Sequence, residues 1–147
     1  MYNIEEFDKE KIRVLKYILY KKRTEQEVRT KFSREIDEIL LEDIIEYLKE
    51  TKYIDDSEYI QRAVNNFFAL KNLSIKEIKY KLLAKGLNNN LIEDYIEKKL
   101  EDFEQYEIKS AQNIFKKKSV AKDAEEVKQY LLKKGYKTES IEIAIGS

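Results

Sequence analysis

Lysines recur at helical spacing in the middle of the chain, and their ammonium groups could bind a negatively charged partner. Four of them lie on one predicted helix, from Ser74 to Lys85. They are Lys76, Lys79, Lys81 and Lys85. A further run, Lys116–Lys118, closes a later predicted helix. Cations in these positions can contact nucleic-acid phosphates or the carboxylates of an acidic protein surface. For any single lysine, a solvated surface position is the alternative interpretation.

Residue types needed for most catalytic and metal sites are missing. The chain has no cysteine and no histidine, which excludes disulfides, Ser–His and Cys–His pairs, and zinc sites built from thiolates or imidazoles. Asp55 and Asp56 are adjacent carboxylates, but helix capping explains them better than metal binding. We find no nucleophile–base pair and no phosphate-binding loop. We therefore predict no catalytic, cofactor-binding or metal-binding residues and expect a protein that is not an enzyme.

The charges balance overall but are unevenly distributed. Lys+Arg and Asp+Glu both number 29, so net charge gives no evidence for a nucleic-acid partner. From Gln105 onward, however, lysines outnumber acidic residues, nine against six. The beginning of the chain lacks the apolar run of a signal peptide, and no segment approaches the ~20 apolar residues that span a bilayer. We expect a soluble, cytoplasmic protein without a membrane partner.

Apolar spacing and helix-end signals indicate helices throughout. Ser74 and Glu77 form a capping box, and Gly86 can end the helix in a left-handed conformation. Between them runs one apolar stripe, made of Ile75, Ile78, Leu82 and Leu83. The chain has no proline and only three glycines, which also favours an all-α protein. The aromatic side chains at stripe positions, Phe67 and Phe68 among them, are predicted core residues, with base stacking as the alternative.

The pattern repeats about every fifty residues. Thr24, Ser74 and Asp123 each precede a glutamate by three positions. Later apolar positions also correspond across the three copies. They are Val28, Ile78 and Val127; Phe32, Leu82 and Leu131; Ile36, Leu87 and Tyr136; Leu41, Ile92 and Ile141; Ile45, Ile96 and Ile145. In the first copy no glycine follows the capped helix, where Ser33–Glu35 lie instead. A repeat of this length predicts stacked helical units.

We therefore predict three tandem three-helix repeats in an elongated, curved arrangement. Their predicted boundaries are 1–54, with a short N-terminal arm, 55–104 and 105–147. The first ten residues are expected to form an arm or frayed turn, because regular periodicity begins at Ile12. A helix from about Gln105 to Lys118 opens the third repeat, and Thr138 is expected to cap the last helix.

Several of these motifs resemble the RecX family. The run Val14–Leu19 followed by Thr24–Phe32 resembles the opening repeat of that family. Tyr53–Asp56 is similar to its Tyr-Leu-Asp-Asp joint, and Ile78–Leu87 resembles its central Ile-x-x-x-Leu-x-x-Lys-Gly-Ile signature. The third repeat resembles the Lys-Lys tract of the family and, at Tyr130–Tyr136, its Tyr-Leu-x-x-Arg-Gly-Phe element.

The resemblance implies a role in homologous recombination and DNA repair, within the SOS response. RecX-family proteins modulate the RecA recombinase: they lie in the groove of the RecA–DNA filament and typically inhibit its ATPase and strand exchange. The implied partner is the RecA filament, and single- or double-stranded DNA is a further candidate through the basic residues. We expect a monomer. Two alternatives are a helical-repeat DNA-binding module and a protein-interaction scaffold, both unrelated to RecA.

The candidate contacts of the RecA filament or of DNA phosphate are basic residues from all three repeats. They are Lys16, Arg23, Arg29, Lys31, Lys76, Lys79, Lys81, Lys85, Lys116, Lys117, Lys118, Lys133 and Lys134.

Overall fold

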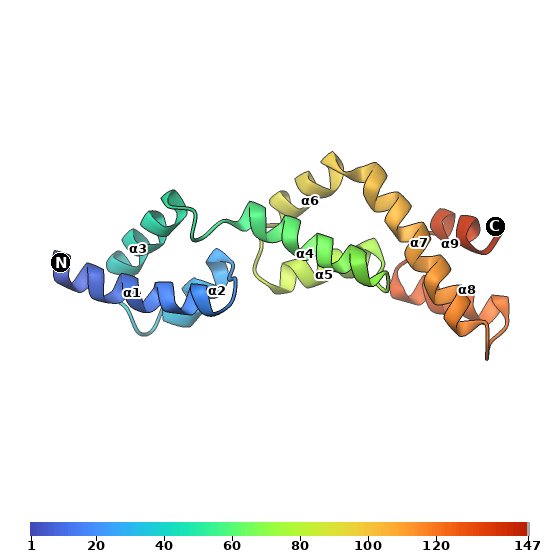
Figure 1. Ribbon diagram of the computed structural model, residues 1–147, viewed down its shortest axis with the longest axis horizontal. Coiled ribbons are helices and arrows are strands. Elements are labelled where there is room, and N and C mark those ends of the chain that lie inside the picture. Colours follow the sequence, from blue (N-terminus) through green and yellow to red (C-terminus); the bar gives the residue numbers. More distant parts are fainter. Residues whose placement is uncertain (147) are drawn as a thin grey trace. The chain divides into compact units, whose positions relative to one another are not determined.

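The structure, a computed structural model, describes residues 1–146 and shows nine α-helices and no strand within them (Figure 1). The helices are α1 (Ile4–Tyr20), α2 (Glu25–Phe32), α3 (Glu38–Glu50), α4 (Asp56–Leu70), α5 (Ile75–Ala84), α6 (Asn89–Lys98), α7 (Leu100–Lys118), α8 (Ala124–Lys134) and α9 (Thr138–Gly146). Each successive set of three opens with its longest helix, of 17, 15 and 19 residues. The prediction of an all-α protein is confirmed.

The chain forms two compact units. The first contains Met1–Ile60 together with Lys85–Leu87, and the second contains Gln61–Ala84 and the chain from Asn88 onward. The three boundaries predicted from the sequence stay a prediction. Within residues 1–146, no helix is both long enough and apolar enough to cross a membrane.

The core of the first unit lies between α1, α2 and α3. Val14 of α1, Val28 of α2 and Ile44 of α3 are completely buried in it. The helix α1 begins much earlier than the sequence periodicity predicted, at Ile4 rather than near Ile12. The reason is an N-cap that was overlooked: the side chain of Asn3 accepts the N–H of Glu6 at 2.9 Å.

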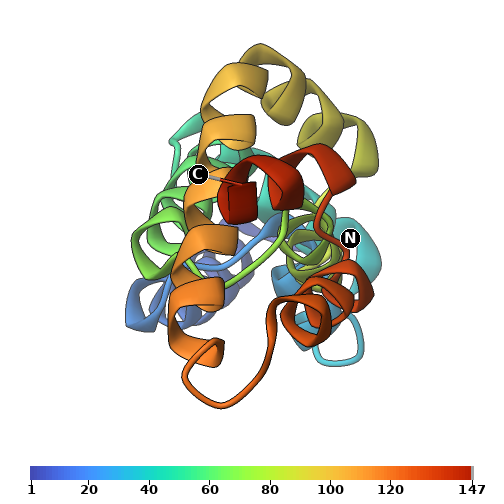
Figure 2. The ribbon, with the colours of Figure 1, turned by 90° about the vertical axis from the view of Figure 1, so that its right-hand side faces the viewer.

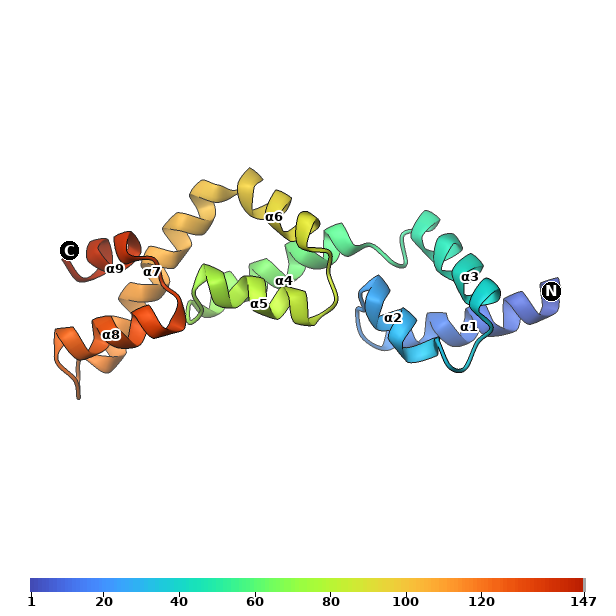
Figure 3. The ribbon, with the colours of Figure 1, turned by 180° about the vertical axis from the view of Figure 1, so that it is seen from behind.

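In the second unit, α9 packs closely against α7 (Figure 2). The predicted start of α7 near Gln105 was wrong, because the helix already begins at Leu100. A single residue, Lys99 with φ −120° and ψ 28°, interrupts the helical backbone between α6 and α7. The chain changes direction there (Figure 3). Phe103 lies directly after this break, on α7, and is fully buried.

The positions that correspond across the three copies are buried in all of them, apart from the partly buried Ile145. Val28, Ile78 and Val127 have no exposed surface, which confirms their prediction as core residues. The prediction was wrong for one residue of the apolar stripe, because Leu83 is 43% exposed. It adjoins Leu82, which occupies the buried face of α5, so the turn of the helix carries Leu83 towards solvent.

The helix caps also make contacts far along the chain. In the first unit, the hydroxyl of Thr24 accepts the N–H of Glu27 and donates to the carbonyl oxygen of Lys85 at 2.7 Å. A glycine with positive φ, Gly86 at 84°, follows that carbonyl. The first copy needs no such glycine after α2, because Ser33 there has ordinary helical angles. The predicted capping boxes and the left-handed Gly86 are confirmed.

A buried carboxylate joins three helices of the second unit. Glu107 of α7 is 0% exposed and accepts hydrogen bonds from the N–H of Ile75 at 2.8 Å and the N–H of Lys137 at 3.0 Å. The hydroxyl of Ser140 donates a third at 2.9 Å.

Thr138 was predicted as the N-cap of the last helix, but it is the first residue of α9. Glu107 instead binds backbone at the start of both α5 and α9.

Candidate partner-binding surface

Three lysines surround the ring of Tyr130 in the second unit. Lys118, the last residue of α7, places its Nζ 4.3 Å from the ring centroid. Lys134 lies one helical turn beyond Tyr130 on α8, with its Nζ at 5.7 Å, and Lys122 in the connecting segment lies at 6.0 Å. Ammonium groups at these distances are attracted to the ring face, which holds flexible side chains near one point.

A surface hollow of about 490 Å³ adjoins this group and is lined by Lys117, Lys118, Tyr130 and Lys134. We call Lys117, Lys118, Lys122 and Lys134 with Tyr130 the Tyr130 cluster. Its arrangement combines several cations with one aromatic ring, the combination that binds phosphate groups or carboxylates beside an apolar or planar group. One of the cations is already shared, because Lys134 forms a 3.2 Å ion pair with Glu77.

The four lysines predicted on the helix from Ser74 to Lys85 are in different situations. Lys79 is paired with Glu93 on α6 at 3.0 Å, and the stem of Lys76 packs beside Gly135. Like Lys76, Lys81 and Lys85 are exposed and form no ion pair within the described residues 1–146. The structure therefore leaves three of these four ammonium groups, those of Lys76, Lys81 and Lys85, available for a partner.

In the first unit, the predicted basic residues are mostly held by neighbours. Arg29 donates a bidentate pair of hydrogen bonds to the carboxylate of Glu42, at 2.7 and 2.9 Å. These bonds raise the pKa of its guanidinium above the ordinary value. Arg23 lies 4.1 Å from the ring centroid of Tyr17, and the Nζ of Lys31 lies 6.0 Å from the same centroid. Lys16 is exposed on α1. Arg29 is thus part of the helix packing as well as a candidate contact.

The thirteen candidates divide between the two units. Five belong to the first unit: Lys16, Arg23, Arg29, Lys31 and Lys85. Of the eight in the second, the structure brings Lys117, Lys118 and Lys134 together. Lys116 and Lys133 are exposed on α7 and α8.

Sequence reasoning missed two members of the Tyr130 cluster. Tyr130 was taken as part of a family-like motif and not as a ring for cations, and Lys122 was not selected. The sequence signal for this cluster was weak. Lys122 and Lys118 precede Tyr130 by eight and twelve residues, and they reach its ring only because the chain reverses direction after α7. Within residues 1–146, no group of three acidic side chains is arranged to hold a metal ion.

Comparison with known proteins shows relatives at the level of both sequence and fold. The regulatory protein RecX of Streptococcus mutans is 36% identical over 138 residues, covering 89% of this chain and 52% of the relative. The regulatory protein RecX of Staphylococcus epidermidis is 32% identical over 156 aligned positions, covering 99% of this chain and 57% of the relative. The chain thus spans just over half the length of these curated relatives.

A solved structure matches over nearly its full length. The crystal structure of RecX from Lactobacillus salivarius has a TM-score of 0.80 with this chain at 26% identity, covering 98% of this chain and 97% of that one. No protein-family model matches the chain.

Proposed function

This chain belongs to the RecX family of regulatory proteins, and from that premise we propose that it regulates the RecA recombinase. The observation that carries this proposal is the combined match in sequence and fold, because the fold alone would not specify a partner. The regulation that we propose is inhibition. The protein binds in the groove of the RecA–DNA filament, lowers its ATPase activity and slows strand exchange. It acts by binding, as a cytoplasmic monomer.

The Tyr130 cluster supports a negatively charged partner surface. Lys117, Lys118 and Lys122 lie at the end of α7 and directly after it, and no ion pair neutralises them within residues 1–146. A RecA–DNA filament offers phosphates and acidic protein side chains at the same time. The exposed Lys81 and Lys85 add two further cations. Because the protein has a net charge of zero, its affinity for DNA alone should be weak compared with its affinity for the filament.

The experiment that tests this proposal is the RecA ATPase on single-stranded DNA, measured with and without the protein. We expect the steady-state rate to fall as the protein is added, and the fall to become smaller as the salt concentration rises, because charged contacts are screened. An unchanged rate at a several-fold excess over RecA subunits would remove the proposal. Strand exchange between homologous DNA molecules provides a second readout and should slow in parallel.

Binding to DNA without RecA separates this role from that of a DNA-binding module. Fluorescence anisotropy with a labelled oligonucleotide measures it directly. If the protein bound naked DNA as tightly as it binds filaments, the contact with RecA would be unnecessary and the alternative would be favoured.

A further inference from the structure

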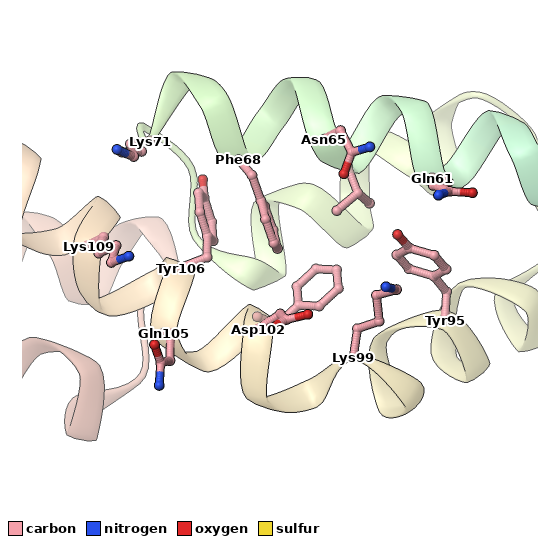
Figure 4. Close-up of a pocket in the computed structure, with 12 residues that line it drawn as sticks. Gln61, Asn65, Phe68, Lys71, Tyr95, Lys99, Asp102, Gln105, Tyr106 and Lys109 are labelled. Atoms are coloured by element: carbon pink, nitrogen blue, oxygen red, sulfur yellow. The ribbon is translucent and has the colours of Figure 1, made fainter.

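A second hollow, of about 350 Å³, lies in the second unit between α4 and the α6–α7 segment (Figure 4). Its wall is aromatic. The ring of Phe68 on α4 stacks on Tyr106 of α7 with centroids 4.2 Å apart, and meets the ring of Phe103 edge to face at 4.9 Å. Tyr95 of α6 continues the series, edge to face with Phe103 at 6.2 Å. The hollow is at the small end of ligand sites, and an aromatic side chain fits within this volume.

Lysines surround this aromatic wall. Lys71 and Lys109 stand towards one end of the hollow and Lys99 towards the other (Figure 4). All three are exposed, and none forms an ion pair within residues 1–146. This contrasts with Lys79 and Lys134 of the same unit, whose ammonium groups are paired with glutamates. The hollow therefore combines an apolar interior with unneutralised positive charge at both ends.

Polar side chains that line the hollow can bind the backbone of a guest. Gln61 and Asn65 of α4 and Gln105 of α7 line the hollow with amide groups, which both donate and accept hydrogen bonds. Tyr95 also lines the hollow and offers a phenol hydroxyl that can donate a hydrogen bond; burial, and to a smaller extent the carboxylate of Asp102, raises its pKa. Amides of this kind suit an extended peptide, whose backbone offers alternating donors and acceptors.

Two features favour a peptide over a nucleic-acid strand. One face of Phe68 and one face of Tyr106 cover each other, which leaves less free ring surface for stacked bases. Asp102 also lines the hollow, and a strand with a phosphate at every nucleotide would bring negative charge close to it. A peptide can place its carboxylates opposite the lysines and an uncharged residue opposite Asp102.

We propose that this hollow binds an acidic peptide segment of a partner protein, with one aromatic side chain inserted against Phe68, Phe103 and Tyr95. Carboxylates on both sides of that side chain face Lys71 and Lys109 at one end and Lys99 at the other. A ring entering the hollow extends the edge-to-face series and buries apolar surface in a site already shaped for it. This site is separate from the Tyr130 cluster and goes beyond the regulation of RecA.

The test uses a short fluorescein-labelled peptide in which a phenylalanine is flanked on both sides by aspartate and glutamate. Its binding to the whole protein is measured by fluorescence anisotropy, without RecA or DNA, so the result is independent of the proposed function. We expect saturable binding that weakens about tenfold or more when serine replaces the phenylalanine, because the buried ring is lost. Equal binding of the two peptides would overturn the proposal.

Variants of exposed residues locate the site. Lys99→Glu combined with Lys109→Glu should weaken binding of the phenylalanine peptide about tenfold, and Asn65→Trp should weaken it by filling the hollow. The matched control is Lys98→Glu combined with Lys137→Glu, which makes the same charge change outside the hollow and should leave binding unchanged. Far-UV circular dichroism shows that each variant keeps its helices. Equal loss in the control pair would reduce the effect to net charge and refute the site.

A labelled single-stranded oligonucleotide in the same assay decides between the two classes of guest. If the hollow variants weakened its binding while the peptide bound no tighter than its serine counterpart, the hollow would be a nucleic-acid site and the proposal would fail.

Discussion

The hydroxyl of Ser74 donates a 2.8 Å hydrogen bond to the carbonyl oxygen of Lys134, sixty residues further along the chain. The same hydroxyl accepts the N–H of Glu77 at the start of α5, so that one fully buried side chain caps its own helix and binds the end of α8. Thr24 makes the corresponding pair of bonds in the first unit, to Glu27 and Lys85. A contact of this kind therefore recurs with the repeat, once within each unit.

Replacing Ser74 by alanine should therefore lower the free energy of unfolding more than the loss of an ordinary helix cap does. We expect Ser74→Ala to lower the free energy of unfolding by about 2–3 kcal/mol, because it removes the cap and leaves the partly buried carbonyl of Lys134 without this donor. Ser74→Thr is the matched control, since Thr24 performs both bonds at the corresponding position. Urea unfolding followed by circular dichroism measures both. Equal losses in the two variants would show that the hydroxyl is not responsible.

Gly86 should tolerate no side chain. A Cβ added there would lie 2.5 Å from the Cβ of Gln26, and its φ of +84° is unfavourable for any other L-residue. We expect Gly86→Ala to lower the free energy of unfolding by about 2–3 kcal/mol. Gly146→Ala is the control, because nothing lies within 4 Å of the added atom. A loss of similar size at Gly146 would point to a general effect of removing glycine.

The sequence was sufficient to predict most of the helices and their buried faces. Capping residues such as Thr24 and apolar spacing such as Val28 to Phe32 are local signals, and each of these residues is buried where the pattern placed it. The features that the sequence did not predict depend on the conformation of a single residue or on contacts with residues far along the chain. No glycine or proline marks the break at Lys99 in the sequence. Glu107 is a charged residue by type, and only the helix ends that surround it explain its burial.

The candidate site was predictable in kind but not in detail. The lysines on α5 and at the end of α7 follow from the sequence, whereas their availability depends on tertiary structure. Lys79 and Lys134 find glutamate partners across the fold, and nothing in the local sequence distinguishes them from Lys81 or Lys117. The hollow beside Phe68 could likewise not be predicted from the sequence, because its walls come from helices far apart in the chain.

Glu107 should be sensitive to the loss of one acceptor atom. In Glu107→Gln, an NH₂ group replaces one carboxylate oxygen and faces donors that now lack an acceptor, either Ile75 N–H on one side or Lys137 N–H and Ser140 on the other. We expect the free energy of unfolding to fall by about 1–3 kcal/mol. The exposed Glu104→Gln provides the control and should change it by less than about 0.5 kcal/mol. A neutral result for Glu107→Gln in urea unfolding would contradict this role.

The buried hydroxyl of Tyr136 should make stability fall at alkaline pH. Burial raises the pKa of this phenol above its ordinary value of 10.0, although a 2.6 Å hydrogen bond with Ser110 acts in the opposite direction. The folded protein therefore keeps a proton that the unfolded chain releases above pH 10, and stability declines as the pH rises through that range. One such group contributes a slope of at most about 1.4 kcal/mol per pH unit.

Tyr136→Phe isolates this contribution. The variant loses the hydrogen bond with Ser110, which lowers its stability by a constant amount, but it should show a shallower decline between about pH 10 and 11 than the wild-type protein. Parallel declines would show that other groups, and not Tyr136, cause the alkaline loss. Absorbance of tyrosinate, followed during the same titration, should show fewer groups ionising late in the variant.

Reversing the charge at the Tyr130 cluster should weaken the action on RecA without unfolding the protein. Lys117→Glu, Lys118→Glu and Lys122→Glu together replace three cations that make no ion pair within residues 1–146, so the core of the second unit is untouched. We expect the concentration needed for half-maximal inhibition of the RecA ATPase to rise about tenfold or more, and the salt dependence of inhibition to become flatter. The control carries the same charge change on Lys9, Lys98 and Lys137, which lie outside the cluster and should matter little. If both triple variants inhibited equally well, the interface would have to lie elsewhere on the protein, with Lys81 and Lys85 the next cations to reverse.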